Sequence, residues 1–319
     1  MKFLKHLFFC ISLTLTSLHS QDGTFGGTPS FEPDDSIPWI DESAEEMPVK
    51  SFGQFDIDYE SIFDSHFKNS DFANQEMGFG EGNIILSYTR LLTKDQGYNV
   101  GGGYTKTTIF WDDNPFFNQD NFDTLNFSLN GFTKCFNCLE LKGGASISID
   151  THQWAWDYNF YTLTGWGRYV WNTRFCGDVG INFGATSRLG LKRGYLYPIF
   201  GVDLTPWEDL QMNLIFPTDM AVIYRIAKYW SLDLRGKLLN SRRRLDKNEV
   251  LSRGYFDYIS SGIELGLNFE CDPYAAANFH VGTTLGNGEL RVSNTDDLDA
   301  RELKISAALY IGGKIWFRF

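Results

Sequence analysis

The most regular pattern of hydrophobic and polar residues lies at the end of the chain, over residues 303–319. Every second residue from Leu303 to Phe319 is apolar or small, and the positions between them are mostly polar or amphipathic. Side chains alternate across a strand, so this pattern predicts a strand with one apolar and one polar face. It is longer than the ~5–6 residues of an average strand. A tilted strand that crosses a bilayer needs roughly 9–11 residues and has this two-faced character.

The same alternation recurs along the chain from residue 52 onward. In 139–150, for example, alanine and isoleucine alternate with serine and aspartate. The strands predicted in this way are 52–60, 82–92, 97–111, 122–132, 139–150, 158–173, 177–189, 195–205, 210–217, 220–228, 230–240, 256–269, 276–286 and 303–319. We therefore predict an all-β fold, a transmembrane antiparallel β-barrel of about 14 strands. The alternative count is 12, if 52–60 and one neighbour are not strands.

The connections between the predicted strands support this count. An even number of strands places both chain ends at the periplasmic rim, and membrane barrels have short periplasmic turns and longer outer loops. Counted back from the last strand, the expected periplasmic connections are short. Most of the expected extracellular connections, such as 112–121, 241–255 and 287–302, are longer.

The N-terminal part of the chain differs from the rest. Residues 1–20 have two early lysines, a short apolar stretch and a small residue at Ser20, which predicts a secretory signal peptide. The rival interpretation is an N-terminal membrane anchor, but the apolar run is short of the ~20 residues that a spanning helix needs. No other stretch approaches that length, so we expect any membrane span of the mature chain to be β. We assign residues 21–51 to a flexible acidic periplasmic arm and residues 52–319 to the barrel.

Charge and aromatic content refine the picture. The net charge of −12 makes nucleic acid an unexpected partner. Residues 21–81 hold 15 acidic and two basic residues, so most of the excess lies early in the chain. A plug or a cation-binding tail is the functional alternative for the arm. Because amphipathic rings favour the headgroup level, aromatic residues near strand ends predict two belts. The outer belt would hold Trp111, Trp154, Trp156, Tyr158, Tyr255 and Tyr258, and the inner belt Tyr169, Trp171, Trp207, Tyr229, Trp230 and Trp316.

The end of the last predicted strand carries a family resemblance. Tyr310, Ile315, Phe317 and the terminal Phe319 resemble the C-terminal strand of bacterial outer-membrane β-barrel proteins, which typically ends in an aromatic residue that the assembly machinery recognises. The resemblance is to the class, as an uncharacterised porin-like barrel, and not to one porin, transporter or enzyme family. It implies secretion to the periplasm, location in the cell outer membrane, and outer-membrane lipid, lipopolysaccharide and the barrel assembly machinery as partners.

The polar faces of the strands predict a charged lumen, because charges on the lipid face would cost a few kcal/mol each. The candidate lumen-lining residues are Arg168, Asp178, Arg188, Arg225, Asp233, Arg235, Glu264, Lys304 and Lys314. Such residues either line a pore that selects small polar solutes or form ion pairs in a closed interior. We expect a channel for passive passage of small solutes, and the alternative is a closed structural or adhesive envelope barrel.

Two local features stand out. Arg242, Arg243 and Arg244 fall in a predicted outer loop, where they would be solvated, bind lipopolysaccharide phosphates or fold inward as a constriction. Four cysteines remain after signal removal, and all lie at predicted periplasmic turns: Cys135, Cys138, Cys176 and Cys271. Because the periplasm is oxidising, we predict disulfides within the barrel or to a neighbouring envelope protein.

Enzymatic motifs are weak in this sequence. Barrel hydrolases need a histidine near a serine or a carboxylate, but no Gly-x-Ser-x-Gly motif is present. His280 is a lone histidine of the predicted lumen and His152 lies in a predicted outer loop. The Cys-x-x-Cys at 135–138 lies in a strand-to-strand turn, which is the wrong context for zinc or redox chemistry. We expect no enzyme activity, no metal and no cofactor.

Overall fold

The computed structural model describes residues 51–136, 138–173, 177–271, 274–297 and 300–319. The predicted signal peptide and the acidic arm up to residue 50 lie outside the described residues. The strands are β1 Ser51–His66, β2 Glu76–Thr93, β3 Gln96–Phe110, β4 Asn121–Cys135, β5 Leu139–Asp150, β6 Phe160–Thr173, β7 Gly177–Gly190, β8 Arg193–Trp207, β9 Leu210–Phe216, β10 Asp219–Ala227, β11 Trp230–Arg244, β12 Tyr255–Cys271, β13 Ala275–Thr284, β14 Gly288–Ser293, β15 Arg301–Ile305 and β16 Leu309–Arg318. Two short 3₁₀ turns, η2 Ser70–Phe72 and η3 Trp156–Tyr158, complete the described elements.

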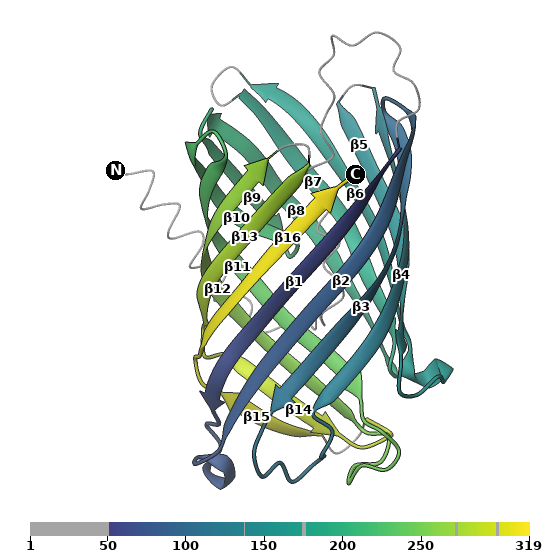
Figure 1. Ribbon diagram of the computed structural model, residues 1–319, viewed down its shortest axis with the longest axis vertical. Helices are drawn as coiled ribbons and strands as arrows, with labels where there is room; N and C mark the ends of the chain where they lie inside the picture. Colours follow the sequence, from purple (N-terminus) through teal and green to yellow (C-terminus); the bar gives the residue numbers. More distant parts are fainter. Residues whose placement is uncertain (1–50, 137, 174–176, 272–273, 298–299) are drawn as a thin grey trace.

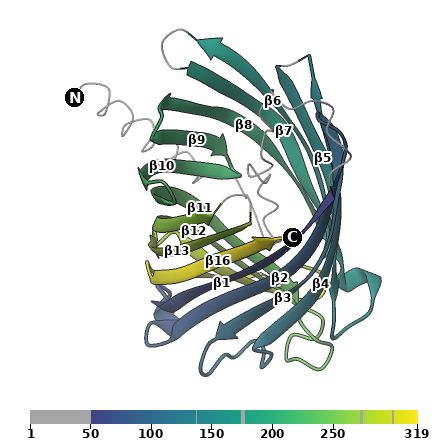
Figure 2. The ribbon, with the colours of Figure 1, turned by 45° about the horizontal axis from the view of Figure 1, so that its top comes forward.

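The strands close into one antiparallel barrel (Figures 1 and 2). Each strand from β1 to β13 pairs with the next, and β16 joins β13 to β1. The ring therefore has 14 strands, which confirms the predicted fold and count. Its first and last strands meet at one rim, where the Gly53 N–H donates to the Phe319 carbonyl at 2.8 Å. We call this the near rim and the opposite end the far rim.

The outer surface of the barrel is apolar along most strands. Leu129 and Phe279 are 58% and 60% exposed, whereas Asn126 and Ser128 on the inner face of β4 are buried. A closed barrel pairs its backbone groups between strands, and an apolar outer band is what lipid requires. The fold is therefore that of a transmembrane β-barrel.

No helix of the described residues is long and apolar enough to cross a membrane.

The residues predicted for the two aromatic belts are mostly exposed at the near rim and mostly buried at the far end. Tyr169, Trp171, Trp207, Tyr229 and Trp230 are exposed near the near rim, as expected, although Trp316 lies on the inner face. At the far end only Trp154 and Trp156 are exposed. The other four predicted belt residues are buried inside the barrel: Trp111, Tyr158, Tyr255 and Tyr258. The prediction failed there because the far-end segments fold inward instead of ending at the headgroup level.

The far end of the barrel is crossed by a sheet that we call the mouth sheet. It consists of residues 237–244 of β11, residues 255–261 of β12, and the hairpin of β14 and β15 (Figure 1). The predicted outer loop 287–302 therefore contains β14, and β15 begins within it. Residues 239–244 are buried on both faces of β11, so this part of β11 lies inside the barrel and not in its lipid-facing wall.

Two irregularities in neighbouring strands, one in β1 and one between β15 and β16, change the direction of the wall below the mouth sheet. In β1 one extra residue falls between Ile62 and Ser65, and the last predicted strand is interrupted at residues 306–308. An extra residue bends a strand and reverses which face its side chains occupy. Leu303 and Ile305 are consequently buried inside, whereas Leu309 and Phe317 point outward. The unbroken alternation expected for residues 303–319 is thus wrong at its far end.

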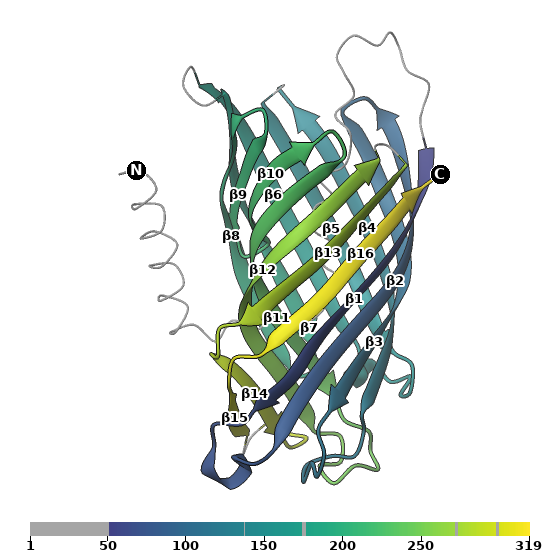
Figure 3. The ribbon, with the colours of Figure 1, turned by 60° about the vertical axis from the view of Figure 1, so that its left-hand side comes forward.

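A short hairpin leaves part of the wall unpaired. The β9–β10 hairpin ends partway along β8 and β11 (Figure 3). Among the described residues, 193–199 of β8 pair only with β7, and 237–244 of β11 pair only with β12. This gap in pairing is what allows β11 to leave the wall and enter the barrel.

Candidate functional site: a polar lumen closed at the far mouth

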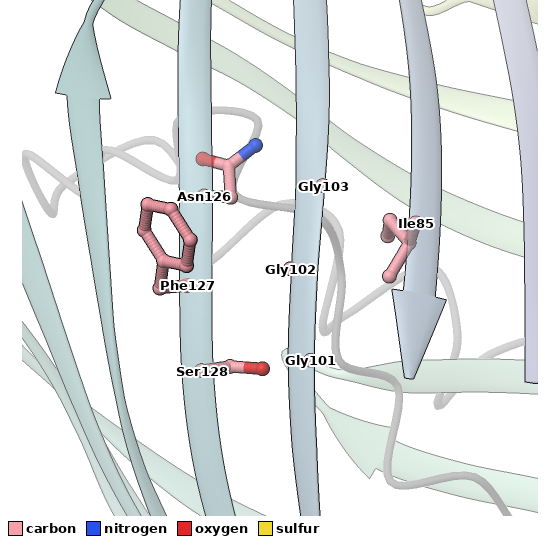
Figure 4. Close-up of a pocket in the computed structure, with 7 residues that line it drawn as sticks. All are labelled: Ile85, Gly101, Gly102, Gly103, Asn126, Phe127 and Ser128. Atoms are coloured by element: carbon pink, nitrogen blue, oxygen red, sulfur yellow. The ribbon is translucent and has the colours of Figure 1, made fainter. Parts of the chain in front are cut away.

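The near half of the barrel interior is lined mainly by polar side chains, beside one small buried apolar cluster of Trp166, Ile199 and Ile215. Thr164 on the inner face of β6 is exposed to solvent, although the wall around it is continuous. On β3 of the same wall, Gly101, Gly102 and Gly103 leave a shallow pocket bordered by Ile85 of β2 and by β4 (Figure 4). Because Gly101 and Gly103 face inward without side chains, the lumen keeps its width at this level.

A row of hydrogen bonds runs around the inner wall from β1 to β5. Asn83 donates to Asp58 at 2.7 Å, and Thr105 donates to Asn83. Asn126 donates to Thr105 at 2.8 Å, and Ser148 donates to Asn126 at 2.6 Å. Each member lies on a neighbouring strand, so the row links five strands through their inward side chains. Such satisfied polar networks rigidify a wall.

An ion-pair group lies on the inner wall between β5 and β8. The Arg168 guanidinium donates to Asp203 at 2.9 Å through Nε and lies 3.4 Å from Glu140. Asn182 donates to the same Asp203 carboxylate at 2.6 Å. The carboxylates thus neutralise Arg168 without closing the lumen.

A second charged group lies between β1, β11, β12 and β16. The Lys237 ammonium contacts Glu60 and lies 3.9 Å from Glu264. The Tyr310 hydroxyl donates to Glu264 at 3.2 Å. The ring of Tyr310 rests on Gly282, where a Cβ would approach it to 2.4 Å. Glycine at this position is therefore needed for the close approach that aims Tyr310 at the carboxylate.

The second group continues through amide side chains toward the near rim. His280 shares a 2.7 Å hydrogen bond with Asn278, and Asn278 donates to Asn268 at 2.7 Å. Asn268 donates to Asp233 at 3.1 Å, and Arg235 donates to the same carboxylate at 2.7 Å. The chain of contacts holds these charges against the wall.

The far half of the interior is filled by apolar side chains, which we call the mouth cluster. Phe116 and Phe117, from the connection between β3 and β4, pack inward. Phe256 of the mouth sheet stacks on Phe117 at 5.9 Å and meets Phe122 at 4.7 Å. The buried members are Ile62, Phe67, Met77, Phe79, Ile109, Trp111, Phe116, Phe117, Phe122, Leu239, Leu245, Phe256, Tyr258, Leu290, Val292, Leu303, Ile305, Ala308 and Tyr310. The polar lumen therefore ends at an apolar seal.

The three consecutive arginines belong to the mouth sheet and not to a solvated loop. Each is at most 4% exposed. Arg243 faces β2 and β3, where it lies 3.2 Å from Glu81 and donates to Thr107 at 2.9 Å. Arg242 and Arg244 face the opposite way. The loop prediction for 241–255 was wrong at its start, because β11 continues to Arg244.

Arg242 and Arg244 attach the mouth sheet to neighbouring connections. Arg242 pairs with Asp257 and lies 3.3 Å from Asp297, and Arg244 pairs with Asp157. Burial raises the pKa of Asp297. The hydrogen bond from the Ser293 hydroxyl and the positive charges of Arg242 and Arg193 lower this pKa by more than burial raises it, so the net shift is downward from the ordinary 3.8.

Seven of the nine predicted lumen residues face inward. They are Arg168, Arg188, Arg225, Asp233, Arg235, Glu264 and Lys314. The structure brings Asp233, Arg235 and Glu264 together and leaves Arg188 apart from them. Lys304 faces outward and is exposed, because the break at 306–308 reverses the face of β15. The side chain of Asp178 lies outside the described part of the structure.

The residues that resemble an assembly signal divide between the two faces. Ile315, Phe317 and Phe319 point outward and are 46–75% exposed, whereas Tyr310 is buried in the interior. Recognition by assembly machinery stays a prediction.

The cysteines are unpaired where the structure describes them. Cys135, Cys138 and Cys271 have free thiols, so no predicted disulfide joins these three. Cys176 lies outside the described residues.

The partners of Arg243, which are Glu81 and Thr107, were not predicted from the sequence. Glu81 lies between two glycines and Thr107 between Lys106 and Thr108, and the pairing spans more than 130 residues of chain. No local pattern encodes such a contact.

Comparisons with known proteins add little on function. No family model matches the sequence. An uncharacterised protein of Chlamydia pneumoniae is 22% identical over 304 residues, which cover 92% of this chain and 95% of that protein.

Among solved structures, an outer membrane channel from Pseudomonas putida F1 has a TM-score of 0.45 and 10% identity, and it covers 88% of this chain and 100% of its own. The Pseudomonas putida toluene transporter TodX has a TM-score of 0.37 and 8% identity, over 93% and 94% of the two chains. At such low values the likeness does not indicate a substrate. The closed ring and its apolar outer face establish this chain as a 14-strand β-barrel of the outer-membrane kind.

Proposed function

We propose that the protein is a channel for small polar solutes that is gated at its far mouth. The observation that carries this proposal is the contrast along the barrel axis. The near half is lined mainly by polar side chains, some of which, such as Thr164 and Arg225, are exposed to solvent, and the far half is sealed by the mouth cluster. A barrel of about 14 strands lies between those whose interior is filled by side chains and the open porins.

The arrangement of the seal supports a gate. It is built largely from a sheet and connections that have left the wall, so it can move while the wall stays closed. Hydrophobic constrictions stop ions by excluding water, and they conduct once they widen. The paired charges of the near half would then line the path of a small polar solute.

The orientation follows from general barrel architecture. Because both chain ends of bacterial barrels lie on the periplasmic side, we assign the near rim to the periplasm and the far rim to the cell exterior. On this assignment the lipid around the mouth is lipopolysaccharide. We propose transport and not catalysis, because His280 is used in a hydrogen bond to an amide.

A closed structural or adhesive barrel is the second candidate. The mouth cluster favours it, since its 19 buried side chains seal the interior in this conformation. In that case the polar near half would be a water-filled vestibule without an exit.

Conductance in planar bilayers separates the two candidates. We expect brief openings of the wild-type barrel and much more frequent openings when Phe116 and Phe117 are both replaced by alanine. Removing a buried phenyl ring costs about 3–5 kcal/mol, and loss of that stabilisation from the closed mouth shifts the population toward the open state.

The matched control removes two phenyl rings from the outer face, in Phe127→Ala together with Phe183→Ala. These rings are 51% and 48% exposed and contact no part of the seal. We expect this control to behave as the wild type does. If folded wild-type and mouth-variant barrels were both silent, the channel proposal would be wrong and the closed barrel would stand.

A further inference from the structure

Arg188 is a buried cation without a carboxylate in direct contact, although the charge of Asp257 acts on it from a longer distance. It lies on the inner face of β7 and is 9% exposed. Within the described residues its Nη2 atom has no hydrogen-bond partner, and no carboxylate lies within 4.0 Å of it. The guanidinium rests on the ring of Phe160, 4.1 Å from the centroid. An aromatic face offsets part of a cation's lost hydration, but it accepts no conventional hydrogen bonds.

Four other arginines at the far mouth each have a carboxylate partner. Arg193 and Arg242 share Asp257 and Asp297, Arg243 has Glu81, and Arg244 has Asp157. Each of these four has a carboxylate within 4.0 Å. Arg188 differs from them because Asp257 is already shared by two guanidiniums.

The residues that flank Arg188 on the inner wall are polar or aromatic. Thr162 lies directly opposite it on β6, and the Oγ1 atom of Thr162 also lacks a partner in the described structure. Tyr195 lies opposite on β8 and stacks on Tyr197, with centroids 6.0 Å apart.

Arg188 lies next to a water-exposed part of the lumen. Thr164 and Thr186 pair directly with each other on the same two strands, two residues closer to the near rim. Their hydroxyls share a 2.9 Å hydrogen bond at a solvent-exposed position. Because the Nη2 atom of Arg188 and the Oγ1 atom of Thr162 are themselves buried, a solute at this position reaches them only after the neighbouring side chains shift.

We propose that Arg188 is the centre of a binding site for the oxyanion of a small solute, a carboxylate or a phosphate. A guanidinium offers a planar fork of donors that matches both groups. The hydroxyl of Thr162 adds a donor, and Phe160 and Tyr195 supply apolar walls for the body of the solute. In the proposed channel, this site would make oxyanions the substrate class. Only this role in transport rests on the proposed function. Binding itself is independent of conduction.

The test measures unfolding of the detergent-solubilised barrel in urea, with sodium benzoate and inorganic phosphate as separate probes at constant ionic strength. A ligand that binds only the folded state raises the unfolding midpoint. We expect at least one probe to do so for the wild type. Benzoate alone indicates a carboxylate site, phosphate alone a phosphate site, and both a general oxyanion site.

Two variants make the assignment specific. Arg188→Met should raise the midpoint of the ligand-free barrel, because it removes an unpaired buried charge, and should weaken the probe about ten- to hundredfold. Arg225→Met is the matched control, since Arg225 is an inward but exposed arginine at the near rim. It should leave the probe effect unchanged.

The proposal is overturned if neither probe shifts the wild-type midpoint. It is also overturned if Arg188→Met destabilises the free barrel and keeps the probe effect, because Arg188 would then have a partner within the protein. Conductance is not needed for either outcome, so failure of the site and failure of the channel are distinguishable.

Discussion

At the scale of single residues, the interior of this barrel is organised by paired charges. Arg243 of the mouth sheet and Glu81 of β2 lie 3.2 Å apart at the far mouth. Both are largely buried, so their pairing matters more than an exposed ion pair would. The mouth sheet is thus attached to β2 by a contact that would be costly to break on one side.

A double-mutant cycle tests this attachment. Arg243→Met should destabilise the barrel by about 3–5 kcal/mol, because it leaves the Glu81 carboxylate buried without its partner. Replacing both residues, with Arg243→Met and Glu81→Gln, should recover much of that loss. Urea unfolding of the four proteins gives the coupling energy. Purely additive single effects would show that the two side chains do not interact.

The carboxyl of Asp297 predicts an acid dependence of the mouth. Its pKa lies below 3.8 because Ser293, Arg242 and Arg193 together outweigh its burial. A carboxyl with a lowered folded pKa stabilises the fold above its unfolded pKa, and this contribution disappears as the pH falls through the folded value.

The wild type should therefore lose more stability than Asp297→Asn as the pH falls from about 5 toward about 2. Urea midpoints at each pH measure the difference between the two proteins. Parallel pH profiles would contradict the assigned role of Asp297.

At the scale of elements, the instructive case is the last predicted strand. Its alternation is regular over residues 303–319, and β16 follows the expected faces. β15 does not, because the interruption at 306–308 reverses the phase. A one-residue slip exchanges the two faces of a strand, so a single irregularity sends Lys304 outward and Leu303 inward.

Cysteine labelling distinguishes these two arrangements. In a chain whose native cysteines are replaced by serine, Lys304→Cys should react quickly with a membrane-impermeant maleimide, because Lys304 is exposed. Leu303→Cys should be protected, since Leu303 is 3% exposed in the mouth cluster. Equal protection of both positions would favour the unbroken strand.

The same reasoning explains the arginine run. Residues 241–244 are all polar, as is typical of a loop, so the sequence predicted that the strand ends at residue 240. Tertiary contacts override this local preference, because carboxylates from three other segments meet these side chains inside the barrel.

At the scale of the whole molecule, the barrel divides into a rigid wall and an inserted seal. The wall is a closed ring of paired strands, apart from the gap beyond the short β9–β10 hairpin. The seal depends on side-chain packing and ion pairs. A closed ladder unfolds only with the loss of many hydrogen bonds, so the wall should resist conditions that the seal does not.

The whole-molecule prediction concerns mobility on detergent gels. Unboiled protein should migrate differently from boiled protein, because a closed barrel stays compact in detergent until it is heated. The measurement is the gel mobility of boiled and unboiled samples of protein purified from a membrane fraction. Identical mobility would contradict a stable closed barrel in the purified protein.

The alternation of side chains along the chain was sufficient to determine the class of fold, the number of strands and most of the inward-facing positions. These follow from local rules, since a strand has a period of two and lipid tolerates only an apolar outer face. Arg168, Asp233 and Glu264 were found in this way.

Only the tertiary structure decided what fills the barrel. The inward path of β11, the burial of Tyr255 and Tyr258, and the isolation of Arg188 depend on contacts between segments far apart in the sequence. An apolar residue has the same local pattern whether it meets lipid outside or another side chain inside. For this reason the sequence described the wall of this protein, and the fold alone revealed its closed mouth.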